Sequence, residues 1–280
     1  MTYVIAEAGA CGDGDLAKMV EQVDACADAG VDAVKFQWTS DATAMARRRG
    51  SAAVDGYEEI YKRYLQWSPE WHDHLLACCK ELDLDYLCSV YLPEDVKEIA
   101  PFVRHFKVSS FETQDRVLLE AVLDEIYVDV DDDDRWMLLS LGMVTDLEWD
   151  MLRMHYASIP SVKFLHCISA YPVPFDAMCL CTINRRSLDG FSDHTAPELT
   201  MTGGLAVAAG ATIIEAHMRL DTTDDKNPDA PHAMTPTQLT DYVQRIRMVE
   251  RGMFTRKPQC EDQMRKYRVG ELDGTSSSYD

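Results

Sequence analysis

Eight short apolar runs alternate along the chain with segments of helical periodicity, and this alternation limits the folds open to the sequence. A short apolar run bounded by turn residues predicts a buried strand, whereas apolar residues three or four positions apart predict a helix with one buried face. Strands that alternate with helices form parallel sheets, because each connection must cross back over the sheet. The expected strands cover residues 3–8, 31–37, 84–90, 102–109, 136–142, 162–167, 190–193 and 211–216.

The helical patterns lie between these runs, at residues 15–30, 69–83, 93–100, 114–126, 145–157, 197–209 and 235–251. The sequence therefore predicts the α/β class and a (β/α)8 TIM barrel, with a doubly wound open sheet as the alternative. A Rossmann fold is disfavoured, because no GxGxxG motif follows the first strand. We expect one barrel domain over residues 1–268, a partly helical insertion at about 38–66, and a disordered tail at 269–280.

The charge balance restricts the partners. Lys and Arg number 27 against 48 Asp and Glu, so the formal net charge is −21. Such a charge argues against nucleic acid and against anionic lipid surfaces. No apolar run approaches the ~20 residues of a membrane helix, and the first residues lack the basic and apolar segments of a signal peptide. We expect a cytoplasmic protein with neither a nucleic-acid nor a membrane partner.

Polar side chains stand where the expected strands end, and those ends form the active-site face of a barrel. A single lysine in an apolar strand is explained as a rim residue, but Lys35 and Lys107 both interrupt strands at the same end. We expect one site there, with candidate residues Glu7, Lys35, Gln37, Ser89, Lys107, Ser110, Glu112, Ser140, Ser169, Tyr171, Ser192, His194 and His217.

These residue types suit a phosphorylated, carboxylated substrate beside a metal ion. Lysines provide point charges for phosphate, and serine hydroxyls donate to its oxygens. His194 and His217 end adjacent expected strands, so they are placed to share a cation. Nitrogen ligands favour Mn²⁺, Co²⁺, Fe²⁺ or Zn²⁺ over Mg²⁺, and two imidazoles leave coordination positions open. Two histidines that bind no metal are the simpler alternative.

The motifs at these strand ends resemble those of the sialic acid synthase family, which comprises the N-acetylneuraminate synthases and their relatives for other nonulosonic acids. The resemblance covers nearly all of residues 3–268. It rests on Ile5-Ala6-Glu7-Ala8-Gly9, Val34-Lys35-Phe36-Gln37, Phe106-Lys107-Val108-Ser109-Ser110-Phe111-Glu112, Leu139-Ser140-Leu141-Gly142, Leu165-His166-Cys167-Ile168-Ser169-Ala170-Tyr171-Pro172, Gly190-Phe191-Ser192-Asp193-His194-Thr195, Ile214-Glu215-Ala216-His217 and Asn227-Pro228-Asp229.

The resemblance implies a (β/α)8 barrel that condenses phosphoenolpyruvate with an aldehyde sugar and releases phosphate by C–O cleavage. It implies a divalent metal on His194 and His217, with Mn²⁺ as the expected ion and Mg²⁺, Co²⁺ and Zn²⁺ as alternatives. Phosphoenolpyruvate and a small aldose are the implied partners, and the protein is expected to be a homodimer. The implied phosphoenolpyruvate ligands are Lys35, Lys107, Ser110, Ser140 and Ser192. The residues implied to contact the sugar or to move protons are Glu7, Gln37, Glu112, Tyr171 and Asp229. The expected catalytic residues are Glu7 and Glu112 from this group, together with Lys35 and Lys107.

Several positions depart from the family pattern. Ala10 and Cys11 replace an Asn-His pair, and Leu141 replaces a threonine. Ala216 replaces a lysine and Ala230 a histidine, although His232 follows nearby. The chain also ends where the family's C-terminal antifreeze-like domain would begin. Because the departures fall mainly on sugar-side residues, we expect an acceptor that differs from N-acetylmannosamine or is smaller.

Two other functions remain open. The first is a related synthase of the Kdo or DAHP type, in which Arg47, Arg48 and Arg49 would meet a second phosphate, although a solvated basic loop is the simpler interpretation of that cluster. The second is a non-catalytic metabolite-binding barrel, suggested by the lost family residues. The retained lysines and histidines argue against it, because buried charges are costly where no function needs them.

Overall fold

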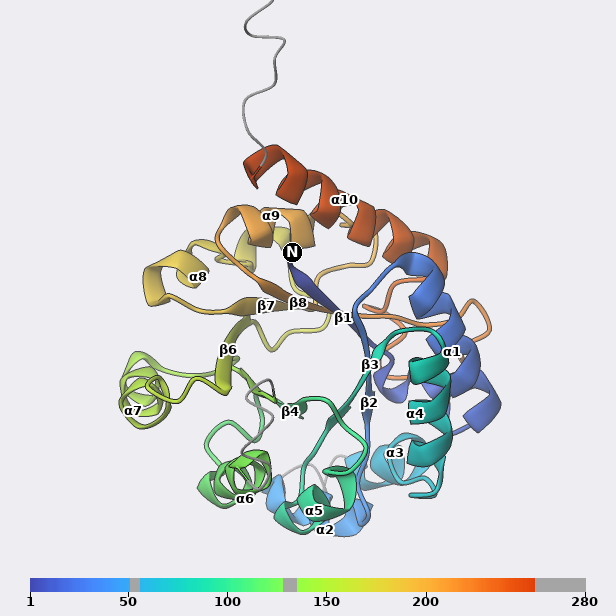
Figure 1. The fold of residues 1–280 in the computed structure, drawn as a ribbon. Helices are drawn as coiled ribbons and strands as arrows, with labels where there is room; N and C mark the ends of the chain where they lie inside the picture. Colours follow the sequence, from blue (N-terminus) through green and yellow to red (C-terminus); the bar gives the residue numbers. More distant parts are fainter. Residues whose placement is uncertain (51–55, 128–134, 255–280) are drawn as a thin grey trace, which may run out of the picture.

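Eight parallel strands close into a barrel in the computed structural model of the chain (Figure 1). The structure describes residues 1–50, 56–127 and 135–254, so the expected domain boundary at 268 and the tail at 269–280 lie outside the described residues. Pairing of β1 with both β2 and β8 closes the sheet. The strands are β1 (Tyr3–Glu7), β2 (Ala33–Gln37), β3 (Asp85–Ser89), β4 (Phe106–Val108), β5 (Met137–Ser140), β6 (Val162–Cys167), β7 (Gly190–Asp193) and β8 (Ile213–His217). The (β/α)8 prediction is confirmed.

Helices surround the barrel, and local residues fix where several of them begin and end. The Asp15 side chain accepts a hydrogen bond from the Ala17 N–H at the start of α1, and Gly30 ends α1 in a left-handed conformation, which glycine adopts without strain. Thr145 and Glu148 form a capping box on α7. The helices are α1 (Leu16–Ala29), α2 (Ala42–Arg48), α3 (Tyr57–Tyr64), α4 (Trp71–Glu81), α5 (Val96–Ile99), α6 (Arg116–Tyr127), α7 (Asp146–Tyr156), α8 (Cys181–Arg186), α9 (Thr202–Ala208) and α10 (Pro236–Phe254).

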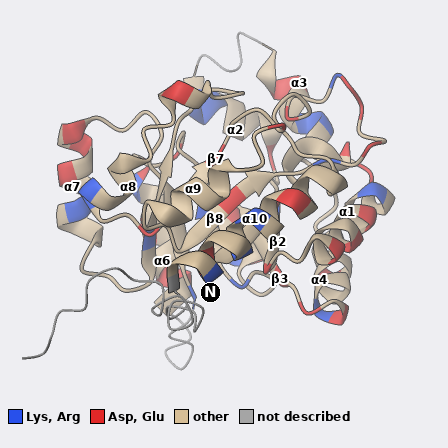
Figure 2. Ribbon diagram, turned by 90° about the horizontal axis from the view of Figure 1, so that it is seen from above, with Lys and Arg blue, Asp and Glu red and all other residues tan. Residues whose placement is uncertain are grey.

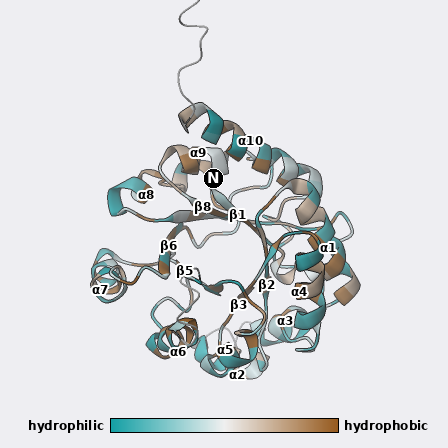
Figure 3. Cartoon of the chain, viewed as in Figure 1, coloured by the Kyte–Doolittle hydropathy of each residue, from teal (hydrophilic) through white to brown (hydrophobic). Residues whose placement is uncertain are grey.

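The largest apolar core lies between the strands and the surrounding helices. It combines strand residues such as Val34 and Phe106 with helix residues such as Met19, Leu119 and Tyr242, all fully buried. The teal and brown segments that alternate along α1 and α10 reflect helices with one apolar face (Figure 3). Burial of this kind supplies the main driving force for folding.

The barrel interior changes character along its axis. Six inward-facing apolar side chains pack together as a floor, namely Ile5, Ala33, Leu87, Leu138, Leu165 and Ile213. Side chains two positions further along a strand point to the same face. On these six strands, those positions hold Glu7, Lys35, Ser89, Ser140, Cys167 and Glu215. The apolar floor therefore supports a polar layer at the carboxyl ends of the strands, which is the catalytic end of such barrels.

Helices α2 and α3 form the expected insertion between β2 and α4. They share a small core of their own with residues of neighbouring loops, including Met45, Tyr61, Tyr64 and Tyr91. Arg49 follows α2 directly and ends that helix. The insertion is thus a packed element that presents side chains toward the carboxyl ends of the strands.

Two expected elements are shorter in the structure, and one helix was missed. The strand expected at 102–109 is only Phe106–Val108, because the Phe102 N–H donates to the Ile99 carbonyl in a turn. The helix expected at 197–209 spans only Thr202–Ala208. Helix α8 was not expected, since it has six residues and buries only Thr182 and Ile183, which leaves no apolar periodicity to detect.

Many of the acidic residues that give the chain its net negative charge lie on the outer helices, whereas a few such as Glu7 and Glu215 are buried. Red segments mark the outer helices in Figure 2, and on α1 the exposed positions include Glu21, Asp24 and Asp28. Among the described helices, none combines the length and the apolar composition needed to cross a bilayer.

Candidate active site

A cavity of about 510 Å³ opens above the polar layer, at the carboxyl ends of the strands. All but two of the predicted site residues line it. The lining residues among them are Glu7, Lys35, Gln37, Ser89, Lys107, Ser110, Ser140, Tyr171, Ser192, His194, His217 and Asp229. The two exceptions do not line the cavity but contact residues that do. Ser169 forms a hydrogen bond of 2.9 Å with Ser110, and Glu112 pairs with Arg49.

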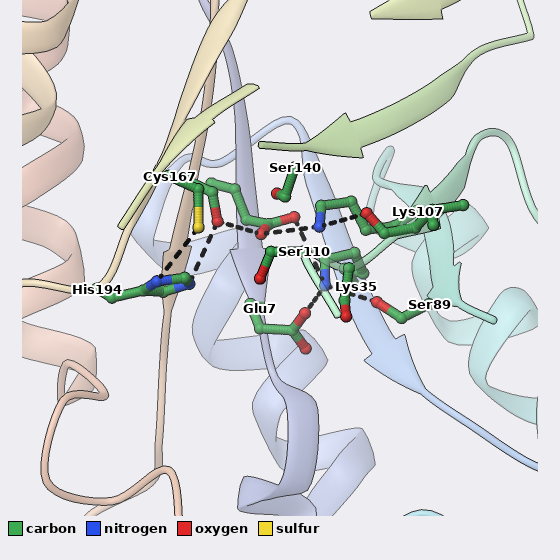
Figure 4. Close-up of polar contacts among 12 residues, drawn as sticks. Glu7, Lys35, Ser89, Lys107, Ser110, Ser140, Cys167 and His194 are labelled. Atoms are coloured by element: carbon green, nitrogen blue, oxygen red, sulfur yellow. Dashed lines mark hydrogen bonds and ion pairs between the residues drawn. The ribbon is translucent and has the colours of Figure 1, made fainter. Parts of the chain in front are cut away.

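Lys35 is the centre of one side of the cavity. Its ammonium group pairs with Glu7, donates to the Ser89 hydroxyl at 3.0 Å, and lies 3.5 Å from Glu215 (Figure 4). The side chain is 2% exposed. A buried ammonium is tolerated only when it is paired and hydrogen-bonded, and these contacts meet that condition.

Lys107 lies beside Lys35 and shares its counter-ion. Its ammonium donates to the Val108 carbonyl at 3.2 Å and lies 3.8 Å from Glu215. Glu215 also accepts a hydrogen bond of 2.7 Å from Ser192. The sequence analysis did not select Glu215 as a site residue. Its position two residues before His217 on the same strand was the signal, because the two side chains must share the inner face.

The pKa values of Lys35 and Glu215 reflect their burial and their ion pairs. Burial lowers the pKa of Lys35, Glu215 raises it and Lys107 lowers it, which leaves that pKa at about 8. Burial disfavours ionised Glu215, but Lys107 and Lys35 outweigh it and hold the pKa of that carboxyl below its usual range. At neutral pH, Lys35 is therefore an ammonium group and Glu215 a carboxylate.

The opposite side of the cavity contains imidazoles and one carboxylate. His217 ends β8, and Asp229 and His232 follow in the next loop. One potential ligand atom from each of the three lies within 4.8 Å of the others. His194 directly follows β7, with its ring centroid 5.3 Å from that of His217 and 6.3 Å from that of His232. Sequence reasoning noted His232 but did not include it among the metal ligands.

Burial holds the imidazoles of His194 and His232 neutral. It lowers the pKa of His194 to about 3, and His217 acts in the same direction. The same cause lowers the pKa of His232 to about 3. The Nδ1 of His194 contacts the Ile168 carbonyl at 3.0 Å, so Nδ1 carries the proton, and Nε2 lies 3.3 Å from the Ser192 hydroxyl. Neutral imidazole is the form that binds metals.

Gly9 allows three acidic and amide groups to converge between the two sides. A Cβ at this position would lie 2.7 Å from Asp229 Oδ2, 3.0 Å from Glu7 Oε1 and 3.1 Å from Gln37 Nε2. Gly9 also has a φ of 47°, which L side chains rarely adopt. Any larger residue would push these side chains apart.

Arg49 enters the cavity from the insertion, which overturns the solvated-loop interpretation for this member of the basic cluster. Its guanidinium donates to Glu112 at 2.7 Å and to the Tyr61 hydroxyl at 2.9 Å, and it lies over the rings of Tyr91 and Phe111. The side chain is 16% exposed. By contrast, Arg48 pairs with Asp115 outside the cavity. No sequence signal separated Arg49 from its two neighbours.

The imidazole side fits a divalent cation. Both ring nitrogens of His232 and the Nδ1 of His217 are buried without a hydrogen-bond partner in the described part of the chain. Asp229 Oδ2 lies 3.5 Å from that Nδ1, without the geometry of a hydrogen bond. Buried polar atoms are ordinarily satisfied, and imidazole nitrogens with a carboxylate oxygen form a usual donor set for transition metals. These groups therefore support the expected metal site, and Mn²⁺ as the bound ion stays a prediction.

Fold and cavity together define a (β/α)8 barrel enzyme with paired lysines facing a cluster of imidazoles. The chain belongs to the NeuB family, whose model matches residues 22–257. This confirms the resemblance to the sialic acid synthases.

Two relatives and one solved structure show the extent of the similarity. The spore coat polysaccharide biosynthesis protein SpsE of Bacillus subtilis is 28% identical over 268 residues, covering 89% of this chain and 67% of that protein. The N,N'-diacetyllegionaminic acid synthase of Campylobacter jejuni is 26% identical over 270 residues, covering 90% and 77%. The crystal structure of N-acetylneuraminic acid synthetase from Leptospira borgpetersenii superposes with a TM-score of 0.80 at 23% identity, covering 95% and 90%. At that identity the superposition supports the fold alone.

Proposed function

We propose that this protein condenses phosphoenolpyruvate with an aldose to give a nonulosonic acid or a similar 2-keto sugar acid, with release of phosphate. The observation that carries the proposal is the placement of Lys35 and Lys107 in one cavity with His194 and His217. The family membership and the names of the relatives support the same reaction class.

The lysine side is suited to phosphoenolpyruvate. Lys35 and Lys107 would neutralise its phosphate and carboxylate groups, and serine hydroxyls would donate to their oxygens. Ser140 Oγ is buried without a partner in the described residues, so it is available to a ligand. Ser89, Ser110 and Ser192 also line the cavity, and Ser169 would act through Ser110, to which it is hydrogen-bonded.

The reaction forms a C–C bond and a C–O bond and breaks one C–O bond. C3 of phosphoenolpyruvate attacks the aldehyde carbon, water adds at C2, and the C2–O bond to phosphate breaks to leave the keto group. The water loses two protons in all, of which one ends on the aldehyde oxygen and the other leaves with the phosphate. Glu7 is placed to take part, since its Oε1 has no hydrogen-bond partner among the described residues and faces the space around Gly9 with Gln37 and Asp229. Positioning and charge stabilisation would supply most of the rate enhancement.

The imidazole side would hold the metal, with His194 and His217 as ligands and Mn²⁺ as the proposed ion. A divalent cation there would polarise the sugar aldehyde as a Lewis acid. Tyr171 lies against both His194 and His232, with ring centroids at 4.5 Å and 5.0 Å. It would orient the acceptor beside the ion.

The acceptor end of the cavity is built by the insertion. Arg49 and Glu112 pair there, surrounded by Tyr61, Tyr91 and Phe111. Because the Arg49 charge is already balanced by Glu112, this end does not favour a sugar phosphate. We therefore propose an uncharged aldose as the acceptor, with Arg49 facing its hydroxyl groups and Glu112 holding Arg49 in place from behind the cavity lining.

The test is phosphate release from phosphoenolpyruvate by the Mn²⁺-loaded full-length protein. The panel contains N-acetylmannosamine, mannose, arabinose 5-phosphate and erythrose 4-phosphate. Release that depends on an uncharged aldose and disappears in His194→Ala and Lys107→Ala supports the proposal. Release with a sugar phosphate alone would replace it by the Kdo or DAHP type. If phosphoenolpyruvate does not bind by calorimetry, the proposal fails and a non-catalytic barrel takes its place.

A further inference from the structure

His232 is a buried histidine that is not one of the two proposed metal ligands, His194 and His217. Its side chain is 4% exposed, and neither ring nitrogen has a hydrogen-bond partner in the described part of the chain. A buried imidazole ordinarily satisfies at least one nitrogen. His72 illustrates this, because its Nδ1 lies 2.7 Å from the Tyr86 hydroxyl. Two unsatisfied nitrogens on one buried ring therefore indicate a missing partner.

The backbone holds His232 toward Asp229. The His232 N–H and the Ala233 N–H both donate to the Asp229 carbonyl, at 3.1 Å and 3.0 Å. Residues 229 and 232 thus share one turn and project to one side. The Asp229 N–H in turn donates to Asn227 Oδ1 at 3.0 Å, and Asn227 Nδ2 donates to the Ala10 carbonyl at 2.7 Å.

The same loop is fastened to β8 beside His217. The Met234 N–H donates to the His217 carbonyl at 2.9 Å, and Met218 and Met234 form a bridge. The rings of His217 and His232 have their centroids 4.5 Å apart in an edge-on arrangement. A preorganised trio results, with ligand atoms of His217, Asp229 and His232 within 4.8 Å of one another.

We propose that His232 is a metal ligand, so that the ion lies between His217, Asp229 and His232. This inference rests on the metal centre of the proposed function and adds a residue that the pair His194 and His217 leaves out. With His194 kept as a ligand, three imidazoles and a carboxylate still leave positions for the acceptor and water in an octahedral ion, as in other catalytic sites with an open coordination sphere.

The proposal predicts the metal preference. A nitrogen-rich donor set follows the Irving–Williams order, in which Co²⁺ and Zn²⁺ bind more tightly than Mn²⁺. Mg²⁺ prefers oxygen ligands and keeps its water shell. The metal-free protein should therefore bind Co²⁺ clearly more tightly than Mg²⁺.

The experiment uses the full chain, stripped of metal with a chelator and titrated with Co²⁺ in a calorimeter. His232→Gln should weaken Co²⁺ binding by at least about tenfold, in line with the effect of perturbing groups around a metal. The control is His74→Gln, which changes an exposed histidine of α4 and should leave the Kd unchanged. Circular dichroism checks that each variant is folded.

A second variant gives a positive signal. In His232→Cys, a thiolate at position 232 should bind Co²⁺ and add a sulfur-to-cobalt charge-transfer band in the near ultraviolet. The band should be missing from the wild type and from His74→Cys. A folded His232→Cys without the band, or a folded His232→Gln with unchanged Co²⁺ affinity, would overturn the role of His232.

His217→Gln separates this inference from the proposed function. If His217→Gln loses Co²⁺ binding while His232→Gln keeps it, the metal centre stands and His232 is not a ligand. If the wild type binds no Co²⁺, or His217→Gln binds it normally, the metal centre itself is wrong. The proposed function then fails together with the inference.

Discussion

The two sides of the cavity differ in how their nitrogen groups are satisfied, although oxygen atoms such as Glu7 Oε1 and Ser140 Oγ on the lysine side also lack partners among the described residues. On the lysine side, Lys35 and Lys107 are paired with Glu7 and Glu215, and Ser89 accepts a further hydrogen bond. On the imidazole side, His232 and one nitrogen of His217 are buried without hydrogen-bond partners among the described residues. The first side can fold with balanced charge, whereas the second is complete only with a ligand.

This difference teaches which properties each side controls. Under the proposed function, the lysine side would exchange its internal ion pairs for contacts with an anionic substrate, so its residues should govern substrate binding and rate. On the imidazole side, a bound ion would make contacts that the metal-free protein lacks, so its binding should also raise the free energy of unfolding. Four predictions test this division, in order of decreasing effect.

Loss of a lysine should cause the largest change in activity. Lys107→Met removes a donor to developing charge and leaves Glu215 with one ammonium partner fewer. We expect kcat/KM for phosphoenolpyruvate to fall by about 10²–10³-fold. Steady-state phosphate release measures the effect, and the exposed Lys97→Met on α5 serves as the control. An active Lys107→Met enzyme would remove this lysine from the mechanism.

Metal should stabilise the fold through the imidazole side. At a free Mn²⁺ concentration of about 100 times Kd, the free energy of unfolding should rise by about 2.7 kcal/mol. Thermal unfolding with and without Mn²⁺ measures this. The same increase in His217→Gln would show that the ion binds elsewhere, and the comparison between the two sides would lose its basis.

The pH dependence should come from the lysine side. Because the pKa of Lys35 is about 8, the ammonium that binds phosphoenolpyruvate loses its proton as the pH rises through 8. The value of kcat/KM for phosphoenolpyruvate should therefore fall about tenfold per pH unit above pH 8. In Lys35→Arg this decline should move to much higher pH, since arginine stays protonated. An unchanged decline would assign it to another group.

Arg49 should affect the acceptor more than phosphoenolpyruvate. Arg49→Lys keeps the charge but loses the fork of donors that reaches both Glu112 and Tyr61. We expect KM for the acceptor to rise by about tenfold, equivalent to about 1.4 kcal/mol, with KM for phosphoenolpyruvate unchanged. Arg48→Lys, outside the cavity, is the matched control. Equal changes in both KM values would place Arg49 with the lysine side.

The sequence was sufficient for the barrel and for most of the cavity wall because both depend on short-range order. Alternation along each strand determines which side chains point inward, and the strand ends of a parallel barrel meet at one face. Lys35, Lys107 and His217 could be predicted from this pattern alone. The start of β4 was predicted too early because the turn at Phe102 has no apolar period to mark it, and the short helix α8 was missed for the same reason.

Residues whose position depends on contacts distant in sequence could not be predicted. Arg49 is drawn into the cavity by Glu112, which is 63 positions away. His232 reaches His217 because Asn227 fastens its loop to Ala10, 217 positions away. The sequence contains both residues, but only the folded chain shows their neighbours.

The apolar floor under the polar layer has a kinetic consequence. Ile5, Leu87, Leu138 and Leu165 close the barrel beneath the lysines, so molecules reach the polar layer from the mouth alone. The reactant that lies against Lys35 and Lys107 must enter first, and the acceptor then blocks its exit. The enzyme should follow a compulsory order of addition, and the deeply bound phosphate should leave only after the larger product has cleared the entrance.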